Sequence, residues 1–188
     1  MEIEKSSACC FQLRSFTPGS APKGLKISGS VGRRPGSLHI EYRVEGDLHR
    51  IIRPMPVPGP TRRHELWRQT CFEFFLGIQG ESAYWEGNLS PCGAWNVYRF
   101  SDHRQEMREE NAVGGPVCRM EAERGRLLFS CTIDIRDICK DCIPLEAGIA
   151  CVIEDFHGAV SYWAVDHCGS KPDFHDRRSF LLKLPAIA

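Results

Sequence analysis

The sequence predicts an all-β protein, folded as a single β-sandwich of jelly-roll-like topology over residues 1–188. Strand patterns recur at short, regular spacing between turn signals, whereas helical periodicity is scarce. No internal repeat and no linker divides the chain. At 188 residues it fits one domain and can bury a core without metal or disulfide staples.

In the N-terminal half, apolar and polar residues alternate over 38–45, which is typical of a half-buried strand. Residues 48–52 are expected to pair beside it across the Gly46-Asp47 turn. Prolines at 54, 56, 58 and 60 follow. Because proline cannot donate a hydrogen bond to a central ladder, they predict an extended crossing segment.

The rest of the chain alternates short strands with tight turns. Strands are expected at 70–77, 84–89, 95–100, 126–134, 148–154, 160–164 and 180–184. Asp155-Phe-His-Gly158 predicts a hairpin turn, with glycine at the position that requires positive φ. The best helical candidate is 103–110, and 135–139 could form one turn.

The composition of the chain argues against some classes of binding partner. Acidic and basic residues balance at 24 each, so the chain carries no electrostatic footprint for nucleic acid or an anionic membrane. No apolar run approaches the ~20 residues of a membrane span. The N-terminus shows no secretory pattern, so we expect a cytoplasmic protein whose ten cysteines are reduced thiols. The Cys139–Cys142 CxxC lacks a second pair and is interpreted as incidental.

Two carboxylates stand inside runs that otherwise resemble buried strand. Strand parity places Tyr84, Glu86 and Asn88 on one face, and Glu73 shares it if the two strands pair as a hairpin. A row of acidic and amide side chains beside Tyr84 and Trp95 is typical of a sugar-binding site. In such sites aromatic rings pack on the C–H face of the sugar ring, and carboxylates and amides hydrogen-bond to its hydroxyl groups. The alternative is a structural network in which these groups satisfy one another. Two carboxylates also suggest glycoside hydrolysis, but the sequence gives no separation, so we favour binding without catalysis.

A second concentration of polar and aromatic residues follows a Tyr-Trp strand near the C-terminus. It contains His167, Asp173 and His175, which are plausible metal-ligand types. Their spacing matches no ligand motif, so no metal is predicted there.

One ordered set of residues spans most of the chain: Gly46-Asp-Leu48, Leu66-Trp67, Thr70-Cys-Phe-Glu73, Asn88-Leu-Ser-Pro91, Gly93, Trp95, Tyr98-Arg-Phe100, Arg104, Met107, Ile153-Glu154, Ser161-Tyr-Trp-Ala164, His167, Lys171-Pro-Asp-Phe-His175 and Phe180. This set resembles the bacterial DOMON-like proteins, a group related to the family 9 carbohydrate-binding modules. The chain departs from their pattern at Gly87, where Phe is usual between Glu86 and Asn88.

The resemblance implies a jelly-roll-like sandwich that binds sugars on a concave face, with calcium elsewhere in some relatives, or that holds b-type haem. Position by position, the central motif matches Glu73, Glu86, Asn88 and Trp95, and the C-terminal motif matches Trp163, His167, Asp173 and His175.

We therefore expect a non-catalytic module for a carbohydrate or similar polyhydroxylated ligand, with no obligatory cofactor. One alternative is a haem protein, whose axial ligands would come from Met107, Met120, His167 and His175. The other is a scaffold with a structural polar core, such as a homodimer or a platform for protein partners.

Overall fold

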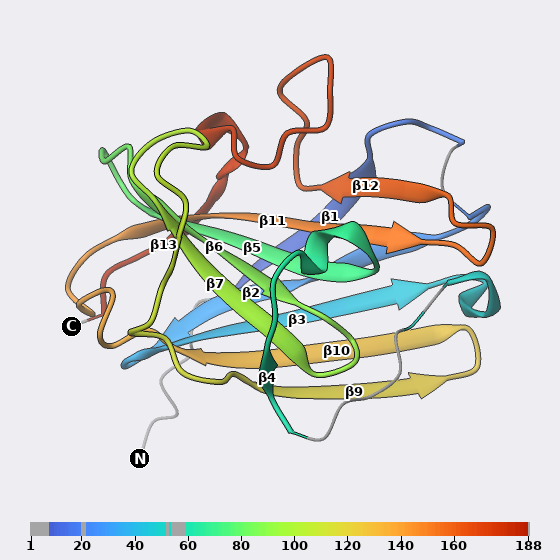
Figure 1. Ribbon diagram of the computed structural model, residues 1–188, viewed down its shortest axis with the longest axis horizontal. Coiled ribbons are helices and arrows are strands. Elements are labelled where there is room, and N and C mark those ends of the chain that lie inside the picture. The colour runs from blue at the N-terminus through green and yellow to red at the C-terminus, as the bar shows by residue number, and fades with distance from the viewer. Residues whose placement is uncertain (1–7, 20–21, 52, 54–58, 188) are drawn as a thin grey trace.

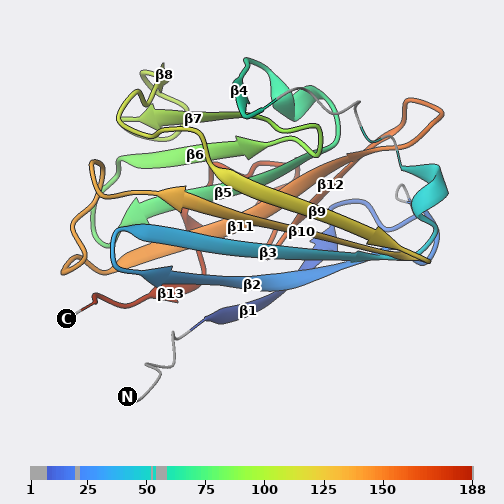
Figure 2. The same ribbon diagram turned by 90° about the horizontal axis from the view of Figure 1, so that it is seen from below.

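The computed structural model describes residues 8–19, 22–51, 53 and 59–187. Its strands form two facing sheets, A and B, and sheet A passes partly in front of sheet B in Figure 2. Sheet A runs β1-β2-β3-β10-β9, with β1 Cys9–Ser15, β2 Lys26–Arg34, β3 Ser37–Glu45, β10 Arg126–Asp134 and β9 Val117–Glu123. Sheet A is antiparallel throughout.

Sheet B lies opposite sheet A (Figure 1). Its order is β4-β7-β6-β5-β11-β12, with β4 Thr61–Arg62, β7 Ala94–Phe100, β6 Tyr84–Leu89, β5 Cys71–Ile78, β11 Leu145–Glu154 and β12 Val160–Ala164. Two short strands extend it: β8 Arg108–Glu109 pairs with β7, and β13 Leu182–Leu184 pairs with β11. Strand β1 joins the layers, because its first part pairs with β2 while Arg14 and Ser15 pair with β12. The all-β sandwich expected from the sequence is confirmed.

The core fills the space between the sheets. Inward residues of β3 and β10 alternate with half-exposed ones, as the sequence pattern predicted. The Phe72 ring of sheet B stacks on Phe129 of sheet A at 4.6 Å between centroids. The Tyr42 hydroxyl crosses the layers and donates to the backbone oxygen of Glu73 at 2.7 Å, which satisfies a buried hydroxyl and ties the sheets together.

Gly87 has a packing partner that explains the departure noted in the sequence. It lies directly opposite Phe74 in the β5–β6 ladder. A Cβ at Gly87 would lie 1.9 Å from Cε1 of the Phe74 ring. The aromatic ring therefore comes from the neighbouring strand and occupies the volume that a side chain at 87 would need.

Two sequence expectations are wrong. Residues 103–110 form no helix: Arg104 and Glu106 adopt left-handed φ values of 54° and 50°, and the segment ends in β8. Tertiary contacts of Arg104, described below, override its helical pattern. The strand expected at 48–52 is replaced by a 3-10 helix, η1 Leu48–Arg50, which Asp47 caps by accepting from His49 N. Ile51 makes an isolated bridge with Asp155 and not with β3, and residue 52 lies outside the described residues. Most of the proline-rich segment, residues 54–58, lies outside the described residues.

Helical structure in the described part of the chain is limited to short 3-10 segments: η1, η2 Leu66–Arg68 and η3 Arg177–Ser179. None of these described helices is long and apolar enough to cross a membrane. The expected hairpin at 155–158 is confirmed, with Gly158 at φ 77° between β11 and β12.

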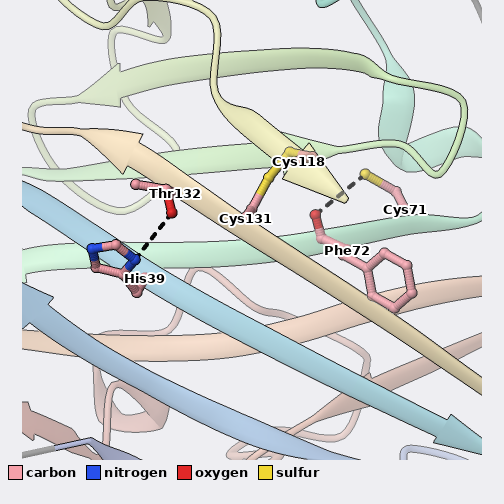
Figure 3. Close-up of a disulfide and its surroundings, with 6 residues drawn as sticks. All are labelled: His39, Cys71, Phe72, Cys118, Cys131 and Thr132. Carbon is pink, nitrogen blue, oxygen red and sulfur yellow. Dashed lines mark hydrogen bonds between the residues drawn. A yellow bond between two sulfur atoms is a disulfide. The ribbon is translucent and has the colours of Figure 1, made fainter. Parts of the chain in front are cut away.

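The cysteines differ from the expectation of ten reduced thiols. Cys118 and Cys131 lie opposite each other in the β9–β10 ladder and are joined by a disulfide (Figure 3). The other eight cysteines are free, including buried Cys139 and exposed Cys142 of the CxxC. Among the described residues, no group of three or more His, Cys, Asp or Glu side chains is arranged to hold a metal ion.

Candidate functional site

The outward face of sheet B carries polar side chains in register. Glu73 lies opposite Asn88, and Asn88 lies opposite Asn96. Glu86 is set between Phe75 and Tyr98 in the adjacent row. Because side chains alternate along a strand, this register places Glu73, Glu86 and Asn88 on one face, as the sequence predicted.

Three covering segments leave a pocket of about 320 Å³ over this face. They are η2, the loop after β7 and the loop that precedes η3. The pocket is lined by Trp67, Glu73, Glu86, Phe100, Arg104, Met107, Val152, Tyr162, Pro172, Phe174 and His175. Aromatic and apolar side chains outnumber polar ones, as in most small-molecule sites.

The two glutamates are almost sealed, with Glu73 2% and Glu86 4% exposed. Glu86 Oε1 accepts from Asn88 Nδ2 at 2.7 Å, and Oε2 lies 3.6 Å from His175 Nε2. Glu73 differs, because no group in the described chain hydrogen-bonds to its Oε1 atom. A buried carboxylate oxygen without a partner is costly, and here it belongs to a residue that lines a pocket.

Burial sets the protonation of the pair. It raises the pKa of Glu73 well above its ordinary value, and the neighbouring Glu86 raises it further, against the opposing charge of Arg104. Burial also raises the pKa of Glu86 to about 7, although the Asn88 hydrogen bond and Arg104 work in the opposite direction. The pair therefore holds a proton at neutral pH.

His175 closes one end of the pocket as a neutral imidazole. Burial, followed by the charge of Arg104, lowers its pKa to about 3. The Tyr84 oxygen accepts from Arg104 N at 3.1 Å and lies 2.8 Å from His175 Nδ1. If Tyr84 donates its proton to Nδ1, the remaining imidazole proton is on Nε2 and faces Glu86.

Asp173 anchors the two covering loops to each other. It accepts from Arg104 Nη2 at 2.9 Å, pairs with His103 Nε2 at 2.8 Å and accepts from His175 N at 3.1 Å. The guanidinium of Arg104 is thus committed to Asp173, although it lies close enough to influence both glutamates. These bonds hold the loop after β7 in its non-helical shape.

The residues singled out in the sequence fall into three groups. Glu73, Glu86 and His175 line the pocket. Tyr84, Asn88 and Asp173 do not line it but hydrogen-bond to residues that do. Trp95, Trp163 and His167 lie outside it.

The two tryptophans belong to the core between the sheets, at 5% and 6% exposure. Trp95 lies opposite Leu89, so it shares the inward face and not that of Asn88. Trp163 Nε1 donates to Ser161 Oγ at 3.0 Å. His167 Nε2 lies 2.8 Å from the backbone oxygen of Arg14, at the β1 end of the sheet.

Sequence reasoning missed most of the pocket wall. Trp67, Arg104 and Met107 were part of the resemblance but were not assigned to the carbohydrate site, and Met107 was named only as a possible axial ligand of haem. Phe100 could have been found, since it is two residues from Tyr98 on the outward face of β7. Tyr162 and Phe174 were also part of the resemblance, but the sequence does not place them at the site: Tyr162 lies on β12, two strands from β5 in sheet B, and Phe174 lies in the loop before η3.

No protein-family model matches the chain, and no curated protein matches it. Solved structures do resemble it. One is a candidate carbohydrate-binding protein from Bacteroides uniformis, with a TM-score of 0.66, 11% identity, and coverage of 91% of this chain and 83% of that one.

Two further similar structures are family 9 carbohydrate-binding modules from Caldicellulosiruptor kristjanssonii. The glucose complex has a TM-score of 0.50 at 12% identity, with 88% of this chain and 78% of that one covered. The cellotriose complex has a TM-score of 0.45 at 9% identity, with coverage of 77% and 67%. At such low identity, the similarity to the Bacteroides protein and the glucose complex shows a shared β-sandwich fold.

Proposed function

We propose that this chain is a non-catalytic binding module for a carbohydrate or similar polyhydroxylated small ligand, held in the sheet B pocket. The observation that carries the proposal is Glu73 Oε1, a buried carboxylate oxygen that lacks a partner in the described chain and belongs to a pocket-lining residue. A ligand hydroxyl or other donor would satisfy it.

The pocket matches the two-sided chemistry of a sugar. Glu73, Glu86 and His175 supply hydrogen-bonding groups, while aromatic side chains supply surfaces for C–H groups. Its volume of about 320 Å³ lies within the range of small-molecule sites. The fold shared with the Bacteroides protein and the glucose-bound module supports the same ligand class.

The placement of the carboxylates favours binding over glycoside hydrolysis. Glu73 and Glu86 project from one face of adjacent strands. A glycosidase needs carboxyl groups that flank the scissile bond, one as acid and the other as nucleophile or base. Because Glu73 and Glu86 lie on the same side of the pocket, they are better placed to hydrogen-bond to one side of a ligand than to flank a scissile bond.

Haem is the second candidate, because Met107 and His175 both line this pocket. Against it, the two ring nitrogens of His175 already face Tyr84 and Glu86. Met120 lies on β9 of sheet A, and His167 bonds to Arg14, so neither of these alternative ligands lines the pocket.

A thermal-shift screen against mono- and oligosaccharides, calcium and haemin tests the proposal. A sugar at a hundred times its dissociation constant should stabilise the fold by about 2.7 kcal/mol. The shift should disappear in Trp67→Ala and persist in Trp95→Ala, each measured against its own ligand-free midpoint. Haemin uptake with a Soret band would favour the haem alternative, and no response to any compound would favour a scaffold.

A further inference from the structure

The charges in the pocket do not balance. The lining side chains that can carry charge are Glu73, Glu86, Arg104 and His175. His175 is neutral because its pKa is about 3. The Arg104 charge is matched by Asp173, to which its guanidinium donates twice, from Nε at 3.3 Å and Nη2 at 2.9 Å. In the described chain, neither buried glutamate has a salt bridge to Lys or Arg.

We propose that the natural ligand of this pocket carries an ammonium group, as an amino sugar does, and that this group lies against Glu73 Oε1 beside Glu86. The inference rests on the proposed function and narrows its ligand class. A buried carboxylate pair is stabilised most by an opposite charge that also donates hydrogen bonds, and an ammonium brings three donors.

The aromatic side chains that line the pocket also favour a ligand with an ammonium group. Trp67, Phe100, Tyr162 and Phe174 line the pocket around the carboxylates. Aromatic faces attract cations through their quadrupole, most strongly where water is excluded. A neutral hydroxyl could donate to Glu73, but it would leave the pair without a compensating charge.

Proton release provides a specific signature. The titratable groups that interact with Glu73 or Glu86 are Arg104, His175, Tyr42, Tyr84, Tyr98, Cys71 and Cys151. Asp173 and His103 contact Arg104 or His175. When an ammonium binds, the proton that the glutamate pair holds at neutral pH should pass to the buffer while both carboxylates become ionised. A neutral sugar should release none.

Calorimetry with D-glucosamine, D-glucose and N-acetyl-D-glucosamine at pH 7, in two buffers of different ionisation enthalpy, tests the inference. Glucosamine should bind about tenfold tighter than the neutral sugars, since charged hydrogen bonds are the stronger ones. Only glucosamine should release protons. Glu73→Gln should abolish both the preference and the release, whereas Glu121→Gln, at an exposed carboxylate on β9, should retain them.

The outcomes separate the two proposals. Equal affinities for glucose and glucosamine, without proton release, would overturn the ammonium inference and leave sugar binding supported. No binding of any of the three sugars at millimolar concentration would overturn both. Wild-type preference that persists unchanged in Glu73→Gln would also overturn the inference.

Discussion

The Tyr84 hydroxyl lies 2.8 Å from Nδ1 of His175, which joins the middle of sheet B to the C-terminal covering loop. Tyr84 is fully buried and its ring stacks on Phe100 at 5.0 Å between centroids. Through Arg104 N, the same oxygen also fixes the loop after β7. One phenol thus holds both loops that close the pocket.

Tyr84→Phe should keep the ring stacking but leave His175 Nδ1 and Arg104 N without a partner. His175 is buried whereas Arg104 is exposed, so the main cost is the unsatisfied imidazole nitrogen, and the unfolding free energy should fall by about 1–3 kcal/mol. Urea denaturation measures it. Tyr162→Phe is the matched control: its hydroxyl has no partner in the described chain, and its change should stay within about 0.5 kcal/mol. Equal effects of the two variants would contradict the role of Tyr84.

Stability should fall as pH rises from 6.5 to 8. The folded-state pKa values of Glu73 and Glu86 are raised, so the folded protein binds more protons than the unfolded chain until pH passes those values. The depressed pKa of His175 acts oppositely, but only between about 3 and 6.5. Above pH 6.5 the glutamates dominate: Glu86 contributes a loss of stability up to about pH 7, and Glu73, whose pKa is raised well above its ordinary value, continues the loss beyond it.

Denaturation curves across this pH range measure that slope. Glu73→Gln should flatten it and make the protein more stable than wild type at pH 8, because one buried carboxylate no longer ionises. Glu121→Gln should keep the wild-type slope. A stability that rises with pH over this interval would show that the pair is ionised and satisfied in the ligand-free protein.

Gly87→Ala should destabilise the sandwich by about 1–3 kcal/mol, because its Cβ would overlap the Phe74 ring. Thermal or urea unfolding tests this. The double variant Gly87→Ala/Phe74→Leu should lose less than the sum of its two single variants, since the smaller Leu side chain relieves the overlap. Strict additivity would mean that the two positions do not compete for the same volume.

The Cys118–Cys131 disulfide predicts the thiol count. Because two of the ten cysteines form a disulfide, a thiol-reactive reagent should detect eight thiols in unfolded protein prepared without reductant. It should detect ten thiols after reduction. Reduction should lower stability by about 2–4 kcal/mol. Ten thiols in the unreduced sample would restore the expectation of a fully reduced protein.

Sequence patterns predicted the strands that alternate or carry long apolar runs. They missed β2, in which glycines interrupt the alternation; Gly29 is required there because a Cβ would lie 1.8 Å from the Glu41 backbone oxygen. They also missed β9, whose residues are mostly exposed. Both strands are specified by partners distant in sequence and not by their own periodicity.

Only those parts of the candidate site that lie on strands could be predicted, because side chains alternate between the two faces of a strand. The alternation within β6, together with its pairing to β5, groups Glu73 with Glu86 and Asn88. The same argument, applied to β7, would have placed Trp95 with Leu89 in the core. His175 and Arg104 lie in loops that pack over these strands. The loops are held together by contacts between residues far apart in the sequence, such as Asp173 and Arg104, which are 69 residues apart. No local sequence pattern predicts that these loop residues lie beside the glutamates.

The indole N–H resonances of the four tryptophans test the central claim most directly. Of Trp67, Trp85, Trp95 and Trp163, only Trp67 lines the sheet B pocket; the other three belong to the core. In a titration with a binding sugar, followed by ¹⁵N–¹H correlation spectra, the Trp67 signal should shift while the others stay in place. Shifts at Trp95 or Trp163 with Trp67 unmoved would place the ligand elsewhere and contradict the account.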